Sequence, residues 1–234
     1  ASGELICAIA MTEPNTGSDL SAVRATAIRK DDHYLLNGQK TFISNGILSD
    51  LVIVVAKTDT TKGGSGISLI VVERDTAGFE RGRNLEKIGM HSQDTAELYF
   101  NDVKVPLNNI LGEEGKGFKY ILDGMNAERI LIASECIGDA RWFIEKASNY
   151  ARDRQVFGRA IGQNQGVQFP IAKAYAAMAA ADLMVNKAAQ MFDAGEPCGA
   201  EANMAKMLAA DASWQAADMC LQTHGGFGFA EEYD

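Results

Sequence analysis

The sequence predicts an α+β protein in which an antiparallel β-sandwich or barrel domain is followed by an antiparallel α-helical bundle domain. Short β-branched runs separated by turns fill the first half, whereas segments rich in Ala, Met and Leu with helical periodicity fill the second half. The composition changes once, near Pro106–Gly117. We therefore expect a β domain at residues 1–112 and a helical domain at residues 113–234.

Strand-like runs alternate with turns throughout the first domain. These runs are Ile6–Met11, Thr26–Arg29, His33–Leu36, Leu51–Ala56, Ser68–Glu73 and Ala96–Val105. The glycines between the fourth and fifth runs, Gly63, Gly64 and Gly66, predict a loop or a hairpin. Such even spacing of short strands is typical of a sandwich or a barrel.

Helical periodicity predicts three long helices in the second domain. They cover about Gly117–Arg154, Gln165–Asp193 and Ala200–Thr223. Pro170 falls in the first turns of the second helix, where proline is best tolerated, and Gly195 follows its end as a stop signal. Three long helices with short connections form most of a bundle, and such helices often continue to pack against another subunit.

The composition argues against several classes of protein. The chain has 234 residues, 47% hydrophobic and 23% charged, so it can bury a large core without disulfide or metal staples. A net charge of -9 without a basic stripe argues against nucleic-acid binding. The three histidines and four cysteines are scattered, which argues against a metal site, and no stretch approaches a membrane span. The chain starts inside a strand-like run and stops without helix-ending residues, as expected for a piece of a longer protein.

Two polar, turn-rich segments between the strand-like runs are the most specific signal in the chain. Met11–Asp19 reads MTEPNTGSD and Asn37–Gly46 reads NGQKTFISNG. Free backbone amides beside short hydroxyls suit a polar heterocycle or a phosphate, although either segment alone is more often an ordinary surface loop. Together and in this order they resemble the flavin-binding loops of the acyl-CoA dehydrogenase family. The strand-then-helix order also resembles the middle and C-terminal domains of that family.

The resemblance implies that these segments hold the isoalloxazine ring of FAD. Met11 and Thr12 would line the pyrimidine end of the ring, and Ser18 would serve the pyrophosphate or the neighbouring CoA. Phe42 and Ser44 would lie against the ring and its N5 atom, where many members carry Trp and Thr. The alternative for Phe42 is a strand residue that packs into the core of the sheet.

Two segments of the helical domain resemble those that bind the other end of the cofactor, RQVFGRAIGQNQ at Arg154–Gln165 and QTHGGFGF from Gln222. A guanidinium is a fixed planar donor to phosphate, and paired glycines allow close backbone approach. The alternative is a solvated Arg154 and a helix-ending glycine pair. By resemblance the following residues bind the ADP portion of an FAD in an adjacent subunit, so a dimer or tetramer completes the site: Arg154, Phe157, Gln165, Gln222 and Gly226.

Glu128 is the candidate general base. It shares one stripe of the first long helix with Ile121, Met125 and Ile132, at i, i+4, i+7 and i+11. A carboxylate on an apolar stripe is costly unless it is paired or functional, and desolvation would raise its pKa towards the range that a general base needs. The alternative is an ion pair with a neighbouring helix.

The resemblance supports Glu128 but leaves a second position open. Most members of the family place the catalytic Glu in a segment that would lie beyond Asp234, whereas a minority place it on this helix immediately before an Arg, as in Glu128-Arg129. Glu135 is a weaker candidate without a motif. Ser18, Met125 and Arg129 would line the acyl-CoA side of the site.

The implied activity is FAD-dependent α,β-dehydrogenation of an acyl-CoA thioester to the trans-2-enoyl-CoA, with electrons passed to an electron-transfer flavoprotein. An acyl-CoA oxidase, a nitroalkane-oxidase-like enzyme and a non-catalytic member of the fold are the alternatives. An Asp base would be expected for nitroalkanes, and the complete cofactor set argues against a scaffold. The implied localisation is the cytoplasm of a bacterium or the mitochondrial matrix of a eukaryote.

Overall fold

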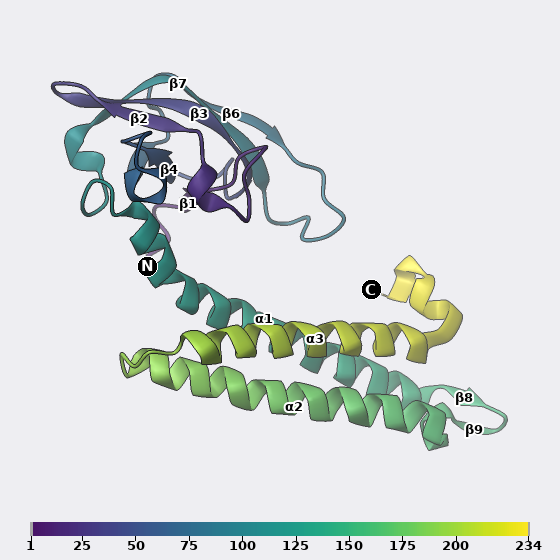
Figure 1. The fold of residues 1–234 in the computed structure, drawn as a ribbon. Coiled ribbons are helices and arrows are strands. Elements are labelled where there is room, and N and C mark those ends of the chain that lie inside the picture. The colour runs from purple at the N-terminus through teal and green to yellow at the C-terminus, as the bar shows by residue number, and fades with distance from the viewer. Residues whose placement is uncertain (1, 234) are drawn as a thin grey trace. The chain divides into compact units, whose positions relative to one another are not determined.

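The computed structural model describes residues 2–233, and these residues form an α+β protein (Figure 1). They divide into two compact units between Leu122 and Asp123. The first unit is built on a sheet, and the second is built on helices. The division falls inside the longest helix, so the first turns of that helix pack with the sheet unit.

Seven strands form one sheet in the described part of the first unit. They are β1 (Cys7–Ala10), β2 (Thr26–Arg29), β3 (His33–Ser44), β4 (Leu51–Lys57), β5 (Ile67–Glu73), β6 (Phe79–Asn84) and β7 (Thr95–Pro106). Short 3-10 turns lie between strands at Leu20–Ala22 and Gly63–Gly66, and another follows β7 at Leu107–Asn109. The strand order is β1-β4-β2-β3-β7-β6, and β5 pairs with β4.

The sheet is partly parallel, which differs from the wholly antiparallel sheet that the sequence predicts. The long ladder of β3 and β7 is antiparallel, but β1 and β2 both run parallel to β4. Parallel neighbours need a long crossover, which is usually a helix. Here the β2–β3 hairpin lies between β1 and β4 in the chain, so the sequence carries no strand–helix–strand signal of parallel pairing.

Strand β3 continues to Ser44, through the segment that the sequence predicts to be a turn-rich loop. Its pairing with β7 shifts register between Leu36 and Gly38 and again between Lys40 and Ile43. Gly38 has φ 145°, and a Cβ there would lie 2.6 Å from the Ala25 Cβ, so glycine is required. Bulges such as these interrupt the alternation of polar and apolar residues by which strands are recognised in a sequence.

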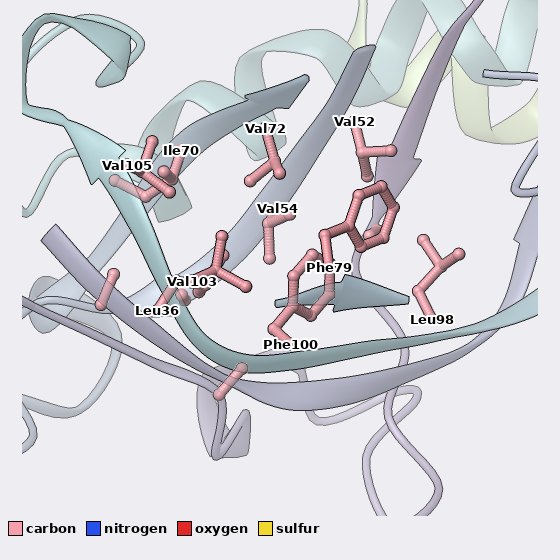
Figure 2. Packing of buried hydrophobic residues seen from close by; sticks show 14 of the residues in the cluster. Leu36, Val52, Val54, Ile70, Val72, Phe79, Leu98, Phe100, Val103 and Val105 are labelled. Carbon is pink, nitrogen blue, oxygen red and sulfur yellow. The ribbon is translucent and has the colours of Figure 1, made fainter. Parts of the chain in front are cut away.

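Residues from both arms of the curled sheet share one core (Figure 2). The rings of Phe79 on β6 and Phe100 on β7 stack with centroids 5.0 Å apart and an interplanar angle of 3°. Leu36 on β3 is opposite Val103 on β7, and both are fully buried. Strand β6 is absent from the predicted elements because Phe79 is its one buried residue, and charged side chains follow it.

A buried ion pair joins the Met11–Thr16 segment to β3. Lys40 Nζ donates to Glu13 Oε1 and to the Met11 carbonyl oxygen, at 2.9 Å each. Glu13 also accepts from the backbone amides of Arg24 (2.7 Å) and Ala25 (2.9 Å). The side chains of Lys40 and Glu13 are 0% and 7% exposed. Burial lowers the pKa of Lys40, and the charge and hydrogen bond of Glu13 oppose that shift.

The second unit contains three long helices (Figure 1). They pack through stripes of small residues. The helices are α1 (Gly117–Asp153), α2 (Gln165–Asp193) and α3 (Gly199–His224), which agree with the predicted ranges to within one residue at each end. A short hairpin, β8 (Gln155–Val156) and β9 (Arg159–Ala160), joins α1 to α2, and 3-10 turns cover Ile161–Gln163, Gly225–Phe229 and Glu231–Tyr233. The buried stripe of α3 shows the spacing: Ala202, Ala205, Ala209, Ala212, Ala216 and Met219.

Breaking the buried pair from one side is expected to destabilise the protein severely. Lys40→Met leaves the Glu13 carboxylate buried without its cation, which costs about 3–5 kcal/mol of unfolding free energy. Lys62→Met is the matched control, because Lys62 pairs with Asp59 on the surface and its side chain is 66% exposed. That variant should lose less than about 1 kcal/mol. Urea unfolding of both variants measures the difference, and equal losses would contradict the role of the pair.

Candidate functional site

The two polar segments of the first unit lie side by side. The buried Glu13–Lys40 pair holds the first segment against β3, and the Thr41 amide donates to the Thr12 carbonyl oxygen at 2.9 Å. The segment itself closes on a reciprocal pair of backbone bonds between Glu13 and Thr16. The main chain around Thr12 is therefore fixed beside the strand that carries Phe42 and Ser44.

Phe42 and Ser44 are both exposed and lie two residues apart on β3. Phe42 is 67% exposed, so it does not pack into the sheet core. Its φ is 58°, in the left-handed region that a bulky residue rarely adopts, and such strain is typical of functional positions. The buried side chains of Thr41 and Ile43 flank it. This part of β3 presents an open aromatic face beside a hydroxyl group.

The other predicted residues of this segment differ in exposure. Met11 is half-buried and packs against an apolar cluster of the first unit that includes Val23, Val55 and Ile121. Its backbone is held by Lys40 through the carbonyl oxygen. Thr12 is half-buried, and Ser18 is exposed. The Met11 side chain is thus part of the internal packing, whereas Thr12 and Ser18 keep hydroxyl groups within reach of solvent.

A hollow of about 420 Å³ in the second unit brings together Arg154 and Gly226. It lies between the end of α1, the β8–β9 hairpin and the turn that follows α3. Its lining residues are Tyr150, Arg154, Val156, Ile161, Thr223, His224, Gly225, Gly226 and Phe227. A neighbouring hollow of about 470 Å³ contains Gln222 together with Gly226.

The surroundings of Arg154 and Gly226 suit an anion. Within residues 2–233, no carboxylate pairs with Arg154, and its guanidinium carbon lies 5.5 Å from the centroid of the Phe227 ring. A Cβ at Gly226 would meet no atom of the chain within 4 Å, so packing within the chain does not explain this glycine. An open backbone beside an uncompensated guanidinium is the arrangement that phosphate groups prefer.

Phe157 and Gln165 flank this region from the hairpin and from α2. Phe157 and Gly158 form the turn of the hairpin with φ of 55° and 76°, as a type I′ turn requires, and Phe157 is 99% exposed. Gln165 is the first residue of α2 and is exposed. Neither residue lines the two hollows that contain Arg154 and Gln222. The structure thus groups Arg154, Gly226 and Gln222, and leaves Phe157 and Gln165 beside them.

Glu128 is exposed on α1, and the buried apolar stripe that the sequence analysis assigned to it is wrong. Ile132 is 41% exposed, whereas the buried face of the helix in the bundle contains Ala133, Ile137 and Ala140. The stripe was misjudged because Ile121 belongs to the sheet unit and alanines, rather than large residues, form the bundle core. The expected desolvation of Glu128 therefore has no support within the second unit.

Met125 and Arg129 lie on the same stretch of α1 as Glu128. Both are half-buried, and the Arg129 guanidinium reaches Asn126 Oδ1 at 3.5 Å and Met125 Sδ at 3.6 Å. These contacts fold the Arg129 side chain back along its own helix. Glu128 thereby stays unobstructed at the surface of the unit, next to a fixed cation.

Glu13, Lys40 and Phe227 are absent from the predicted site. Lys40 contacts the predicted Met11, Glu13 pairs with Lys40, and Phe227 contacts the predicted Arg154. The sequence did carry a signal for Lys40, since this lysine between Gln39 and Thr41 interrupts an otherwise neutral run. Phe227 offered no signal, because the contact with Arg154 joins residues 73 positions apart through the turn after α3.

Each unit separately carries residues that fit one part of a dinucleotide with an aromatic ring system. The first unit provides a strained, exposed aromatic side chain and fixed backbone, and the second provides an uncompensated guanidinium and open glycines. Within residues 2–233, no group of three or more His, Cys, Asp or Glu side chains could hold a metal ion. No helix in the described part of the chain is long and apolar enough to cross a membrane.

The chain matches two family models, "Acyl-CoA dehydrogenase, middle domain" over residues 8–103 and "Acyl-CoA dehydrogenase, C-terminal domain" over residues 115–234. It is 42% identical over 233 residues to an acyl-CoA dehydrogenase of Bacillus subtilis, and the match covers 100% of this chain and 62% of that relative. It is 43% identical to the mitochondrial long-chain specific acyl-CoA dehydrogenase of Rattus norvegicus, over 99% of this chain and 54% of that relative.

A similar fold is found in the crystal structure of acyl-CoA dehydrogenase from Geobacillus kaustophilus. The TM-score is 0.96 and the identity is 45%, over 99% of this chain and 62% of that one. The chain therefore spans between about half and two thirds of the length of these relatives. Family models that cover both units, together with relatives more than 40% identical, show that this chain belongs to the acyl-CoA dehydrogenase family.

Proposed function

We propose that the protein to which this chain belongs is an FAD-dependent acyl-CoA dehydrogenase that converts an acyl-CoA to the trans-2-enoyl-CoA. The observation that carries this proposal is the exposed, strained Phe42 beside Ser44, on a strand fixed to the Met11–Thr16 segment by a buried ion pair. Membership of the family supports it. A scaffold without a cofactor would have no use for a strained aromatic residue in solvent.

Residues of each unit would hold a different end of FAD. Met11 and Thr12 would bond the pyrimidine edge of FAD, while Phe42 and Ser44 would cover its ring near N5, and Ser18 would bond the pyrophosphate or the CoA. The ADP end would contact Arg154, Phe157, Gln165, Gln222 and Gly226. The chemistry that bound FAD supplies is acceptance of a hydride from the β-carbon of the substrate.

The length of α1 supports completion of the site by a second subunit. Glu128 and Asp153, which precedes Arg154, are separated by 25 residues of one continuous helix. At 1.5 Å per residue they lie roughly 38 Å apart along its axis, which is farther than an FAD molecule reaches. The base and the phosphate site of one chain therefore serve different flavins, and a dimer or a tetramer is the assembly that we propose.

Glu128 would remove the α-proton of the thioester, with Met125 and Arg129 lining the acyl-CoA side. An exposed carboxylate becomes a stronger base when a bound substrate excludes water from it. Arg129 stays charged throughout, so it is a binding group rather than a proton carrier. If the base lies in a segment after Asp234 instead, Glu128 is dispensable for the reaction.

The reduced protein would pass electrons to an electron-transfer flavoprotein. The proposed localisation is the bacterial cytoplasm or the mitochondrial matrix, and the rat relative is a mitochondrial protein by its name. An acyl-CoA oxidase is the second candidate, because it would use the same loops and differ in the access of oxygen. Comparing reoxidation in air with reoxidation by an electron-transfer flavoprotein separates the two.

Anaerobic addition of acyl-CoAs of different chain lengths to the full-length protein tests the activity and the base together. The parent should bleach its flavin absorption with at least one chain length, whereas Glu128→Gln should keep its flavin and bleach about 100-fold to 10,000-fold more slowly, as expected for loss of a general base. Glu135→Gln, an exposed carboxylate on the same helix, is the matched control and should bleach like the parent.

Each part of this prediction can fail separately. Normal bleaching by Glu128→Gln would contradict Glu128 as the base and would favour a base in a segment after residue 234. A parent flavin that stays oxidised with every acyl-CoA would exclude the dehydrogenase, and a parent that binds no flavin would exclude the cofactor site.

Removal of the Arg154 guanidinium should weaken FAD binding. A lost charge-assisted hydrogen bond to phosphate raises the dissociation constant about 10-fold to 100-fold in Arg154→Ala. Arg152→Ala is the control, because Arg152 is equally exposed but bonds Asn149 and Asp153 on its own helix. Titration of the apoprotein with FAD gives both values. An Arg154→Ala variant that binds as tightly as the parent would contradict the phosphate contact.

A further inference from the structure

We propose that Phe227 is a positioning residue for the cofactor site, because its ring sets the direction in which the Arg154 guanidinium presents its donors. The inference rests on the proposed function and extends it to a residue without a ligand contact of its own. The Arg154 guanidinium carbon lies 5.5 Å from the ring centroid of Phe227, within the range of a cation–π interaction. Both side chains line the same hollow.

Arg154 has little else to fix it. It follows the last residue of α1, and its amide donates to the Tyr150 carbonyl oxygen at 2.8 Å. Its side chain is exposed, and no carboxylate within residues 2–233 pairs with it. A long, solvated side chain loses conformational entropy when it binds a ligand, so a neighbour that already restricts its rotamers strengthens binding.

The Phe227 ring is itself anchored by an aromatic cluster. Its centroid lies 5.0 Å from that of Tyr233, and Tyr233 meets the rings of His224 and Tyr150 edge-on at 6.2 and 6.4 Å. His224 stacks on Tyr150 at 4.1 Å and lies 2.8 Å from the Cys220 carbonyl oxygen through Nδ1. The cluster therefore ties the turn after α3 to the end of α1, which carries Arg154.

Lys146 on α1 also holds Tyr233 in place. Lys146 Nζ donates to the Tyr233 carbonyl oxygen at 2.6 Å and lies 4.6 Å from the centroid of the Trp142 ring. Tyr233, against which the Phe227 ring packs, is thus held from α1 at two levels, by Lys146 and by Tyr150. A ring held in this way can orient a mobile guanidinium rather than follow it.

A double-mutant cycle on the full-length apoprotein tests the inference through FAD affinity. Phe227→Leu should raise the FAD dissociation constant about twofold to fivefold, the effect of losing one exposed cation–π contact. Phe227→Tyr, which keeps an aromatic ring, should bind FAD with the affinity of the parent. In the Arg154→Ala background, Phe227→Leu should leave the FAD dissociation constant unchanged, because the guanidinium that Phe227 orients is absent. Phe229→Leu, in the same turn with a 99% exposed ring, is the matched control and should bind like the parent.

Other outcomes would overturn the inference. An equal loss of affinity in the parent and Arg154→Ala backgrounds would make Phe227 an independent packing residue, and parental affinity in Phe227→Leu would make it irrelevant. If Phe227→Leu lowers the thermal midpoint of the apoprotein, Phe227→Met, which keeps the bulk without the ring, should reproduce the loss of affinity. A parent that binds FAD but shows no coupling defeats this inference alone, whereas a parent that binds no FAD defeats the proposed function as well.

Discussion

The buried ion pair of Glu13 and Lys40 is the constraint on which the candidate flavin platform depends. A lysine with no exposed side-chain surface is stable only with a partner, and Glu13 can be that partner only if the Met11–Thr16 segment folds back over β3. The fold-back places Thr12 beside Thr41, next to the bulge at Phe42. The bulge in turn exposes an aromatic ring that the alternation of a regular strand would have buried or displaced. One electrostatic requirement thus joins two segments beside an exposed aromatic side chain.

The second constraint is the length of α1, which is one continuous helix. Because the helix is continuous from Gly117 to Asp153, the candidate base Glu128 and the candidate phosphate-binding residue Arg154 are far apart in every copy of the chain. A site that needs both must combine elements of two copies. The small-residue stripes of the bundle, such as Ala205 and Ala209 on α3, keep the helices close and this separation rigid.

Much of the fold was predictable because local patterns decide it. The three helices have clear periodicity and end at recognisable signals, such as Gly195 with φ 70°, so their predicted ranges agree with the structure. Strands with regular alternation were predicted equally well. The remainder of the sheet was not, since β6 buries only Phe79, the bulges of β3 hide its continuation to Ser44, and parallel pairing with β4 depends on contacts between distant segments. Resemblance suggested the residues that we propose to face ligands, but the supports beneath them, Lys40 and Phe227, are set by tertiary contacts alone. The burial expected for Glu128 was wrong because alanines, rather than large residues, mark the packed face of α1.

Hydrogen exchange of the full-length parent protein tests most directly whether the buried pair fixes the platform. The amides of Arg24 and Ala25 donate to Glu13, and the amide of Thr41 donates to the Thr12 carbonyl oxygen. They should exchange as slowly as the amides of the β3–β7 ladder. The Thr61 amide, which donates to the surface carboxylate of Asp59, should exchange much faster. If the Arg24, Ala25 and Thr41 amides exchange as fast as that of Thr61, the segment opens independently of the sheet and the buried pair does not hold the platform together.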